Sequence, residues 1–292
     1  MASEEFDKAV TTANALGELV KNAGNSKEGK QAASNLGKAA VTLTDAVNNC
    51  LLPIAAVNYA FGKARDYFAT RFKDDLASNT AQIPPESLIE PKASLAGPAL
   101  QGLAFSHDEP DLKDLYLKLL ATAMDSRNAA SAHPAFVEIL RQLDADEAKL
   151  LKVVLRQIQL PIGIIKETRK PHGSRILWKH LLSWTDDDTG EISVNLKLPV
   201  MIDNWIRLGI IEVRYDRWLA DASEYAWMEK RPELEMLRSQ FQTDESLVNA
   251  EKGLLEPTDL GQQFAMAVGI ISSPNAIMNL MTGLVNQVPT RS

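Results

Sequence analysis

The segment between residues 95 and 154 limits the possible folds of this chain more than any other part. Its larger apolar side chains recur at the spacing of an amphipathic helix, with polar residues between them, at Leu112, Leu115, Tyr116, Leu119, Leu120, Ala123 and Met124. Asp108 and Asp111 lie near the start of this pattern, where the helix dipole favours anions. We therefore predict a helix that ends near Met124 and packs against other helices.

Two further helix starts follow closely along the chain. After a polar Met-Asp-Ser-Arg turn, His133-Pro134 begins a helix whose inner side carries Phe136, Val137, Leu140 and Leu143. Asp144 and Glu147 then have the spacing of a capping box, in which each side chain accepts a hydrogen bond from the other's backbone N–H. This spacing predicts a third helix through Leu150, Leu151, Val154, Leu155 and Ile158.

The N-terminal part of the chain carries a longer apolar stripe. From Leu36 to Phe68 the apolar residues follow the heptad pattern of a coiled coil, which only Pro53 interrupts with a predicted kink. Asn25 and Glu28 have capping-box spacing upstream of the stripe. We predict a long helical hairpin over residues 1–80. We expect residues 36–68 to pack within the chain or to join copies of it in a homo-oligomer.

Four prolines mark a change in organisation after this hairpin, at Pro84, Pro85, Pro91 and Pro98. Proline removes a backbone donor and restricts the residue before it, so such a run breaks regular structure. We predict a Pro-rich strap over residues 81–110, a helical domain over residues 111–270 and a C-terminal helix or tail over residues 271–292.

The C-terminal half mixes helical and extended patterns. A short helix is predicted from the spacing of Leu177, Trp178, Leu181 and Leu182. Residues 196–208 predict a further helix, which Gly209 ends in a left-handed cap. Residues 210–215 alternate apolar and charged side chains as a half-buried strand does, and Leu254-Leu255 predicts a returning strand before a helix that Thr258 caps. The residues between these two strands, 216–252, predict a charged and largely helical insertion.

This order of elements resembles a winged-helix core, in which helices are followed by a small β-hairpin and a further helix. Residues 135–270 would hold that core. The predicted fold class is therefore mainly α, with an N-terminal helical hairpin plus a helical domain that has a winged-helix-like core and a small β-hairpin.

Composition limits the environment and the partners of the chain. Its 292 residues include 31 basic and 38 acidic side chains, and the resulting formal charge of −7 disfavours sequence-independent binding to nucleic acid. The one cysteine, Cys50, cannot form an internal disulfide and fits a reducing compartment. We expect a cytoplasmic protein, because the N-terminus lacks a signal-peptide pattern and no apolar run reaches the length of a membrane-spanning helix.

The residues that join the two central helices form the candidate binding site, which we call the polar elbow: Asp125, Ser126, Arg127 and His133. Arg127 could contact an anion, and His133 could transfer a proton or respond to pH. The alternative is structural, because short polar side chains commonly satisfy backbone groups at helix ends. In that case Asp125 and Ser126 close one helix and His133 caps the next.

No pattern in the sequence predicts catalysis, a cofactor or a metal ion. The four histidines are spread through the chain without the spacing of a zinc site, and the lone cysteine offers no thiolate cluster. Neither a Gly-rich phosphate loop nor a Gly-x-Ser-x-Gly turn occurs. We therefore expect no enzymatic centre, no cofactor and no metal site.

The helices on either side of the polar elbow resemble the Abi-alpha (abortive infection alpha) family of bacterial proteins, which is associated with phage defence. The resemblance rests on LYLKLLATAMDS at 115–126, HPAFVEIL at 133–140, and residues 142–143 and 146–148. Matches in Leu51-Leu52-Pro53-Ile54, Pro84-Pro85-Glu86, residues 203–211 and residues 258–264 extend it over most of residues 36–270. The resemblance implies a role in antiviral defence, and it brings no accepted catalytic residues.

We expect an antiphage protein that recognises a phage or host protein as a binding or regulatory module. Three rival functions stay open: a membrane-disrupting effector that uses residues 36–68, a winged-helix DNA-binding regulator, and an enzyme whose site residues are far apart in sequence.

Membrane attraction is not favoured because few cations lie beside the heptad stripe. DNA binding is not favoured either, since the presumptive recognition helix, residues 195–207, has only Lys197 and Arg207 as cations. We interpret the best basic cluster as a solvated face: Arg169, Lys170, His172, Arg175 and Lys179.

Overall fold

The computed structural model describes residues 58–171, 173–184, 192 and 194–271. The chain divides into two compact units, one of Met1–Lys152 with Gln263–Ser272 and one of Val153–Gln262 with Ser273–Ser292. We call them the helical unit and the sheet unit. The chain passes from one unit to the other within α8, Ala145–Val154, and again within α11, Asp259–Ala267.

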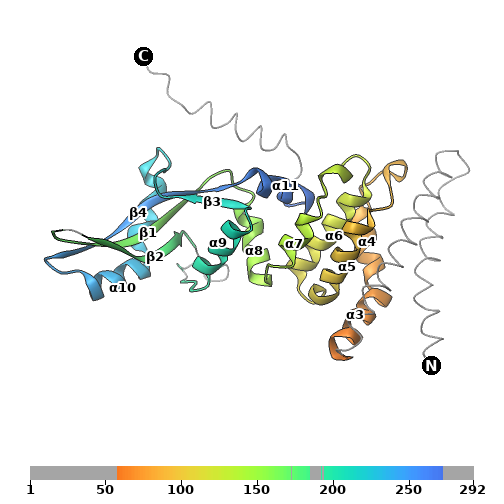
Figure 1. The fold of residues 1–292 in the computed structure, drawn as a ribbon, viewed down its shortest axis with the longest axis horizontal. Helices are drawn as coiled ribbons and strands as arrows, with labels where there is room; N and C mark the ends of the chain where they lie inside the picture. The colour runs from red at the N-terminus through yellow and green to blue at the C-terminus, as the bar shows by residue number, and fades with distance from the viewer. Residues whose placement is uncertain (1–57, 172, 185–191, 193, 272–292) are drawn as a thin grey trace, which may run out of the picture. The chain divides into compact units, whose positions relative to one another are not determined.

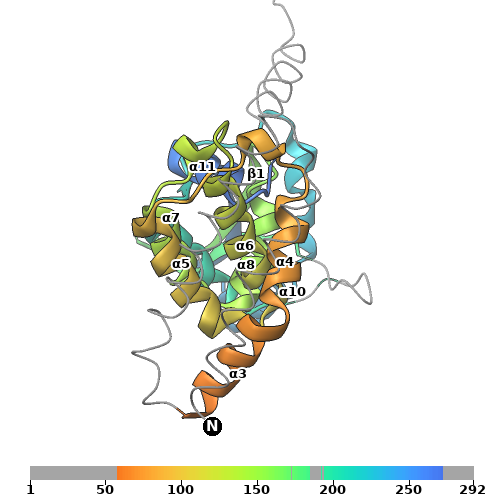
Figure 2. The ribbon, with the colours of Figure 1, turned by 90° about the vertical axis from the view of Figure 1, so that its right-hand side faces the viewer.

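The described part of the helical unit is built from short and medium helices (Figure 1). Besides α8 and the end of α11, these are α3 (Asn58–Thr70), α4 (Phe72–Thr80), α5 (Ala93–Ser106), α6 (Pro110–Met124) and α7 (Ala135–Leu140). The 3-10 turns are η2 (Pro85–Ser87) and η3 (Ala129–Ser131). Helix α5 packs against α3, α6 and α7, and α4 packs against α6 (Figure 2).

The helix predicted to end near Met124 is confirmed as α6, and its apolar stripe forms the centre of this unit. Leu115, Leu119 and Leu120 are completely buried, as are Leu100 and Leu103 of α5. Burial of a leucine side chain stabilises a fold by roughly 1.5–3 kcal/mol. The contact between α5 and α6 therefore fixes the position of the residue at which α6 ends.

The predicted capping box at the start of α8 is confirmed. The backbone N–H of Glu147 donates to Asp144 Oδ1 at 2.7 Å, and the backbone N–H of Asp144 donates to Glu147 Oε2 at 3.0 Å. Because Glu147 is buried, the second hydrogen bond also compensates a carboxylate that has lost contact with water.

The segment between η2 and α5 lies along the end of α6. Leu88 forms an isolated antiparallel bridge with Asp125, and the backbone N–H of Ile89 donates to the carbonyl oxygen of Met124 at 2.8 Å. Helix α5 then begins at Ala93 and contains Pro98. The Pro-rich stretch thus brings a short extended segment against the polar elbow.

The sheet unit is built on a four-stranded antiparallel sheet in the order β2-β1-β4-β3. Its strands are β1 (Leu160–Arg169), β2 (Ser174–Leu182), β3 (Ile211–Arg214) and β4 (Ser246–Pro257). Strand β1 pairs along its length with β4 and also pairs with β2. Strand β3 pairs with the C-terminal part of β4, from Ile211 opposite Pro257 to Arg214 opposite Leu254.

Helices cover parts of this sheet. Helix α10 (Pro232–Phe241) and the 3-10 segment η4 (Ala222–Lys230) lie against its strands (Figure 1). A cluster of buried side chains joins α10 to the sheet: Ile165, Leu181, Leu234, Leu237 and Val248. Helix α9 (Leu198–Arg207) packs against β2 and β3, and its Ile202 and Trp205 are completely buried.

The prediction of a mainly α fold with a winged-helix-like core and a small β-hairpin is wrong. The described residues form a mixed structure in which two long strands, β1 and β2, join the predicted strand pair in one sheet. Strand β2 replaces the short helix that the spacing of Leu177, Trp178, Leu181 and Leu182 predicted.

The physical reason for this error is an irregular strand. Between the pairs Gly163–Leu181 and Ile165–Trp178, β2 advances by three residues while β1 advances by two, so β2 contains an extra residue. A bulge of this kind breaks the alternation of sides that identifies a strand. Trp178 and Leu181 both pack at the same apolar cluster although they are three residues apart, which imitates the spacing of a helix.

Local signals in the C-terminal half were predicted more accurately. The strand predicted over residues 210–215 is β3, and the returning strand is the end of β4. Gly209 follows α9 with a φ of 73°, in the left-handed region. Thr258 Oγ1 accepts a hydrogen bond from the N–H of Gly261 at 3.0 Å, as a helix cap does. The predicted helical insertion holds η4 and α10, but β4 already begins at Ser246.

Several predictions concern residues outside the described ranges. They include the Asn25–Glu28 capping box, Cys50, the kink at Pro53, residues 36–57 of the heptad stripe and residues 272–292. Helix α3 contains the end of the stripe. Among the described residues, no helix combines the length and the apolar character that crossing a bilayer requires.

A buried carboxylate holds the strands together near the turn between β1 and β2. Glu167 accepts hydrogen bonds from Arg169 Nε at 2.6 Å, from Ser246 Oγ at 2.7 Å and from Arg175 Nε. These donors, Arg169 first among them, lower the pKa of Glu167 to about 2. Arg175 also lies over the ring of Phe241, 5.1 Å from its centroid. Two cations of the predicted solvated face therefore compensate an internal anion.

The close approach of α11 to the end of α9 gives a test of this packing. A Cβ atom added at Gly261 would overlap the backbone carbonyl group of Ile210. We expect Gly261→Ala to lower the free energy of unfolding by about 1–3 kcal/mol or more, because backbone cannot move aside as a flexible side chain can. The measurement is urea unfolding followed by circular dichroism.

The matched control is Gly62→Ala in α3, where an added Cβ meets no described atom within 4 Å. Alanine has the higher helix propensity, so this variant should gain up to about 1 kcal/mol. Equal stability of Gly261→Ala and the unsubstituted protein would contradict the described packing of α11.

Candidate functional site

The polar elbow is organised by the carboxylate of Asp125, which follows α6 and is 4% exposed. Its Oδ1 accepts hydrogen bonds from the backbone N–H of Arg127 at 3.0 Å and from Arg127 Nε at 2.8 Å. Its Oδ2 accepts from Arg127 Nη2 at 2.7 Å and from Asn128 Nδ2 at 3.0 Å. The hydrogen bond from the Arg127 side chain is the main cause of a lowered pKa of Asp125, against the opposing effect of burial.

Backbone hydrogen bonds fix the elbow from both sides. The N–H of Ser126 donates to the carbonyl oxygen of Ser87 at 2.8 Å, which ties the elbow to η2. The carbonyl oxygen of Asp125 accepts from the N–H of Ala129 at 2.7 Å, which starts the turn η3. The conformation of residues 125–129 is therefore set by both backbone and side-chain bonds.

The side chain of Arg127 is exposed to solvent, and Asp125 nevertheless holds it in place. Its side chain is 50% exposed, yet its Nε and Nη2 both donate to Asp125 in a two-point pair. An arginine has five N–H donors in a planar fork, so this pair leaves further donors available to a ligand. Because the guanidinium fork is already oriented, binding a ligand costs the Arg127 side chain little conformational entropy.

Ser126 and His133 are also exposed, but they occupy different places. His133 Nδ1 accepts a hydrogen bond from the N–H of Ala135 at 3.1 Å, and its ring meets Phe136 edge-on. His133 thus makes a capping contact at the start of α7. No hydrogen bond between the described residues joins His133 to Asp125, Ser126 or Arg127, so the structure brings together Asp125 and Arg127 only.

The elbow should respond very differently to two substitutions. We expect Asp125→Ala to lower the free energy of unfolding by about 2 kcal/mol, because it removes a buried, charge-assisted set of hydrogen bonds. Arg127→Ala should cost less, because Asp125 keeps its hydrogen bonds from the backbone N–H of residue 127 and from Asn128 Nδ2. Urea unfolding of both variants checks the order, and an Arg127→Ala loss larger than that of Asp125→Ala would contradict it.

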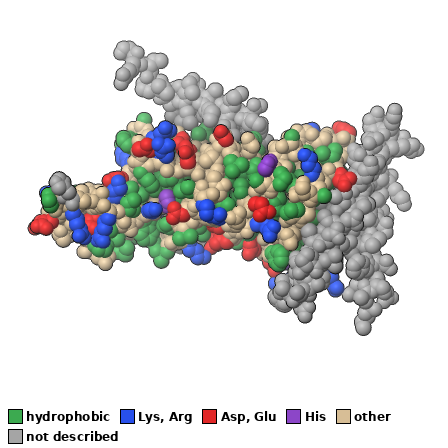
Figure 3. Space-filling view, viewed as in Figure 1, with side chains coloured by type: hydrophobic (Ala, Val, Ile, Leu, Met, Phe, Trp, Pro, Cys, Tyr) green, Lys and Arg blue, Asp and Glu red, His purple; other side chains and the backbone are tan. Residues whose placement is uncertain are grey.

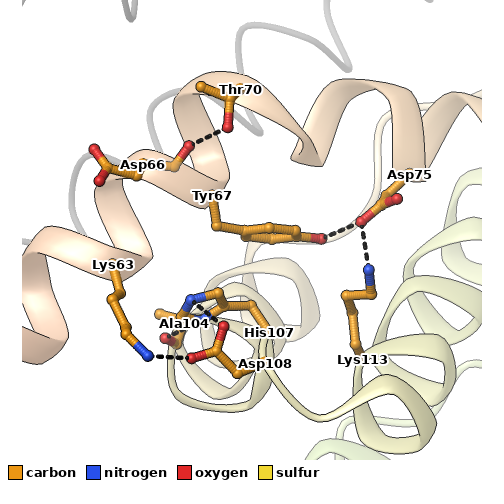
Figure 4. Close-up of polar contacts among 9 residues, drawn as sticks. All are labelled: Lys63, Asp66, Tyr67, Thr70, Asp75, Ala104, His107, Asp108 and Lys113. Carbon is orange, nitrogen blue, oxygen red and sulfur yellow. Dashed lines mark hydrogen bonds and ion pairs between the residues drawn. The ribbon is translucent and has the colours of Figure 1, made fainter.

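A second polar cluster in the helical unit was not predicted from the sequence. In Figure 4 the hydroxyl of Tyr67 donates to Asp75 Oδ2 at 3.0 Å, and Lys113 Nζ donates to the same oxygen at 3.0 Å. The ring of His107 stacks on Tyr67 with centroids 5.1 Å apart, and His107 Nδ1 lies 3.0 Å from the carbonyl oxygen of Ala104. Burial, together with the charge of Asp75, raises the pKa of Tyr67 above its ordinary value, so the hydroxyl stays a donor.

These contacts join three helices to each other. Tyr67 belongs to α3, Asp75 to α4 and Lys113 to α6. The hydroxyl and the ammonium group both donate to the carboxylate, which gives this cluster a structural role in holding the helices in place.

A third polar cluster, in the sheet unit, surrounds His180 at the bulge of β2. His180 is buried and has a φ of 54°, in a region that non-glycine residues rarely adopt. Its Nε2 lies 3.1 Å from Asp203 Oδ1, and its Nδ1 lies 2.9 Å from the hydroxyl of Tyr215. Because Asp203 can only accept, we assign the proton to Nε2 and the Tyr215 hydroxyl as the donor to Nδ1. Desolvation lowers the pKa of His180, and the hydrogen bond to Asp203 opposes that shift.

The lowered pKa of His180 makes stability depend on pH. The unfolded chain binds a proton at the ordinary value of 6.5, while the folded chain binds it only at a lower pH. Stability is therefore fully present above 6.5 and falls as the pH drops below that value.

We expect this fall to be steeper in the unsubstituted protein than in His180→Asn, because asparagine tolerates the left-handed backbone and does not titrate. Thermal unfolding between neutral pH and about pH 5.5 measures the two slopes. Identical slopes would show that His180 is not held in its neutral form.

No sequence pattern predicts these two clusters, because their members come from elements that are far apart in the chain. Tyr67 and Lys113 belong to different helices, and His180, Asp203 and Tyr215 come from β2, α9 and the loop that follows β3. No group of three or more His, Cys, Asp or Glu residues that could hold a metal ion occurs in the described ranges.

The chain is matched by a family model over the part that contains the elbow and both clusters. The model for abortive infection alpha matches residues 64–268, which is more than half of the 292-residue chain. The chain therefore belongs to the abortive infection alpha family, which confirms the resemblance seen in the sequence. Membership indicates an abortive-infection-type defence protein. A search of curated proteins returned no match, and a search of solved structures returned none.

Proposed function

We propose that the chain acts in antiphage defence by binding a partner protein through the polar elbow, with Arg127 as the central contact. Family membership supports the defence role. The observation that carries the proposed binding role is the two-point pair between the exposed Arg127 and the buried Asp125.

The pair favours recognition because of what each partner can still do. The Asp125 carboxylate is saturated by hydrogen bonds and stays ionised, which suits an anchor and not a proton carrier. The Arg127 fork keeps N–H donors that its anchor does not use. Arginines fixed in this way are typical of the residues that dominate binding energy at interfaces.

The chemistry of the elbow also defines the partner surface. Asp125 balances the charge of Arg127, and Glu86 adds further negative potential near it. Charged side chains of both signs are interspersed on the face shown in Figure 3, which does not favour long-range attraction of one sign there. We propose that the partner is a protein loop that offers carbonyl or carboxylate oxygens to Arg127, and that binding depends weakly on salt.

The direct test is phage challenge of bacteria that express the chain. Bacteria that express Arg127→Ala at a normal protein level should lose protection against phage, because the variant lacks the guanidinium N–H donors but keeps the fold. The matched control is Arg207→Ala, which removes an exposed arginine from α9. Arg207→Ala should protect as well as the unsubstituted chain.

A cross-linking experiment in infected cells separates the proposed function from its rivals. A photoreactive residue in place of Ser126 should capture a protein, and Arg127→Ala should abolish the capture. Protection that survives Arg127→Ala would overturn the elbow as the working surface. Liposome leakage by purified protein, unchanged in Arg127→Ala, would overturn the proposal in favour of a membrane-disrupting effector.

A further inference from the structure

A shallow pocket lies on the sheet unit beside the loop that follows β3, residues 215–219. It has a volume of about 390 Å³ and is lined by Gln159, Asp216, Arg217, Trp218, Leu254 and Glu256. Pockets that take small molecules have volumes of about 300–1,000 Å³. The volume lies within this range, and one side of the pocket is open to solvent.

The loop that forms one wall of this pocket is anchored at both ends. At its start, Arg214 makes a two-point pair with Asp216, with Nε–Oδ1 and Nη2–Oδ2 distances of 3.0 and 2.8 Å. At its end, the hydroxyl of Tyr225 accepts from the N–H of Leu219 at 2.9 Å and donates to the carbonyl oxygen of Gly253 at 2.9 Å. The loop is thus fixed to β4.

Two consecutive side chains of this anchored loop make no such bonds. Arg217 and Trp218 are exposed and have no hydrogen bond or ion pair within the part of the chain that the structure describes. The exposed fraction of Trp218 is 59%, which is high for the largest apolar side chain. A single exposed apolar residue is ordinary on a protein surface. Here the tryptophan is next to an arginine without an ion pair among the described residues, and both lie in the wall of a pocket. Such a pair can contact the aromatic part of a ligand through the indole and an anionic part through the guanidinium group.

We infer that this pocket binds a nucleoside monophosphate. The indole of Trp218 offers a flat face on which a base can stack, and the fork of Arg217 matches a phosphate. Gln159 Nε2 donates to Glu256 Oε1 at 2.8 Å, which leaves Gln159 Oε1 and Glu256 Oε2 as acceptors for the N–H groups of a base.

The charges around the pocket favour one phosphate over a chain of phosphates. Arg214 already holds the carboxylate of Asp216, so Arg217 is the cation left for the ligand. Glu256 would repel additional negative charge. The pocket belongs to the sheet unit and the polar elbow to the helical unit, so variants at the two sites change different residues and can be tested independently.

The test is a titration of the full chain with AMP, GMP, CMP and UMP, followed by NMR of the tryptophan indole N–H signals. Trp218→Phe identifies the signal of Trp218, which should shift and saturate with at least one nucleotide. Trp218→Ala should weaken binding about tenfold, as loss of base stacking does. Arg217→Ala should weaken nucleotide binding about tenfold and leave the free nucleoside bound equally well.

Two controls match these variants. Phe105→Ala removes an aromatic side chain with the same exposed fraction, 59%, from α5, and Arg207→Ala removes an exposed arginine from α9. Both should bind the nucleotide like the unsubstituted chain. The inference is overturned if no nucleotide saturates the Trp218 signal at millimolar concentration, if Trp218→Ala binds unchanged, or if nucleoside and nucleotide bind the unsubstituted chain equally.

Discussion

The elbow of the helical unit depends on the need to compensate one buried carboxylate. Asp125 lies at the end of α6, whose apolar face is fully packed, so its side chain is withdrawn from water. A buried anion is tolerated only when donors surround it. The donors come from Arg127 and Asn128, two and three residues further along the chain, and this forces the tight turn that leads into η3. The same interaction that shapes the turn also orients the guanidinium group that we propose for partner binding.

The sheet unit depends in a similar way on an irregularity in β2. The bulge places His180 in a left-handed conformation, where its ring meets Asp203 and Tyr215. Tyr215 begins the loop that carries Arg217 and Trp218. The hydroxyl of Tyr215 bonds both the backbone N–H and Nδ1 of His180, and these two hydrogen bonds link the bulge to the loop that lines the pocket.

The sequence predicts those features that depend on neighbouring residues. The apolar stripe of α6, the Asp144–Glu147 capping box, the left-handed Gly209 and the Thr258 cap were all recognisable, because each depends on residues within one or two helical turns. The residues of the polar elbow were recognisable for the same reason. Their arrangement was not, since only the structure shows that Asp125 binds Arg127 while His133 caps α7.

Features that depend on contacts between distant parts of the chain could not be predicted from the local sequence. The bulge gave Trp178 and Leu181 the spacing of a helix, and this concealed β2 and with it the mixed fold. The polar cluster of Tyr67, Asp75 and Lys113 forms only when three helices pack. Burial, which decides the pKa of His180, likewise has no counterpart in the local sequence.

The central claim is that Asp125 holds the exposed side chain of Arg127 in one orientation before any partner binds. The most direct measurement is NMR relaxation of the Arg127 Nε–H group in the free protein. The account predicts a high order parameter, about 0.85 as in rigid backbone, and its loss in Asp125→Asn. A value below about 0.6 in the unsubstituted protein would show a freely moving side chain and would contradict the account.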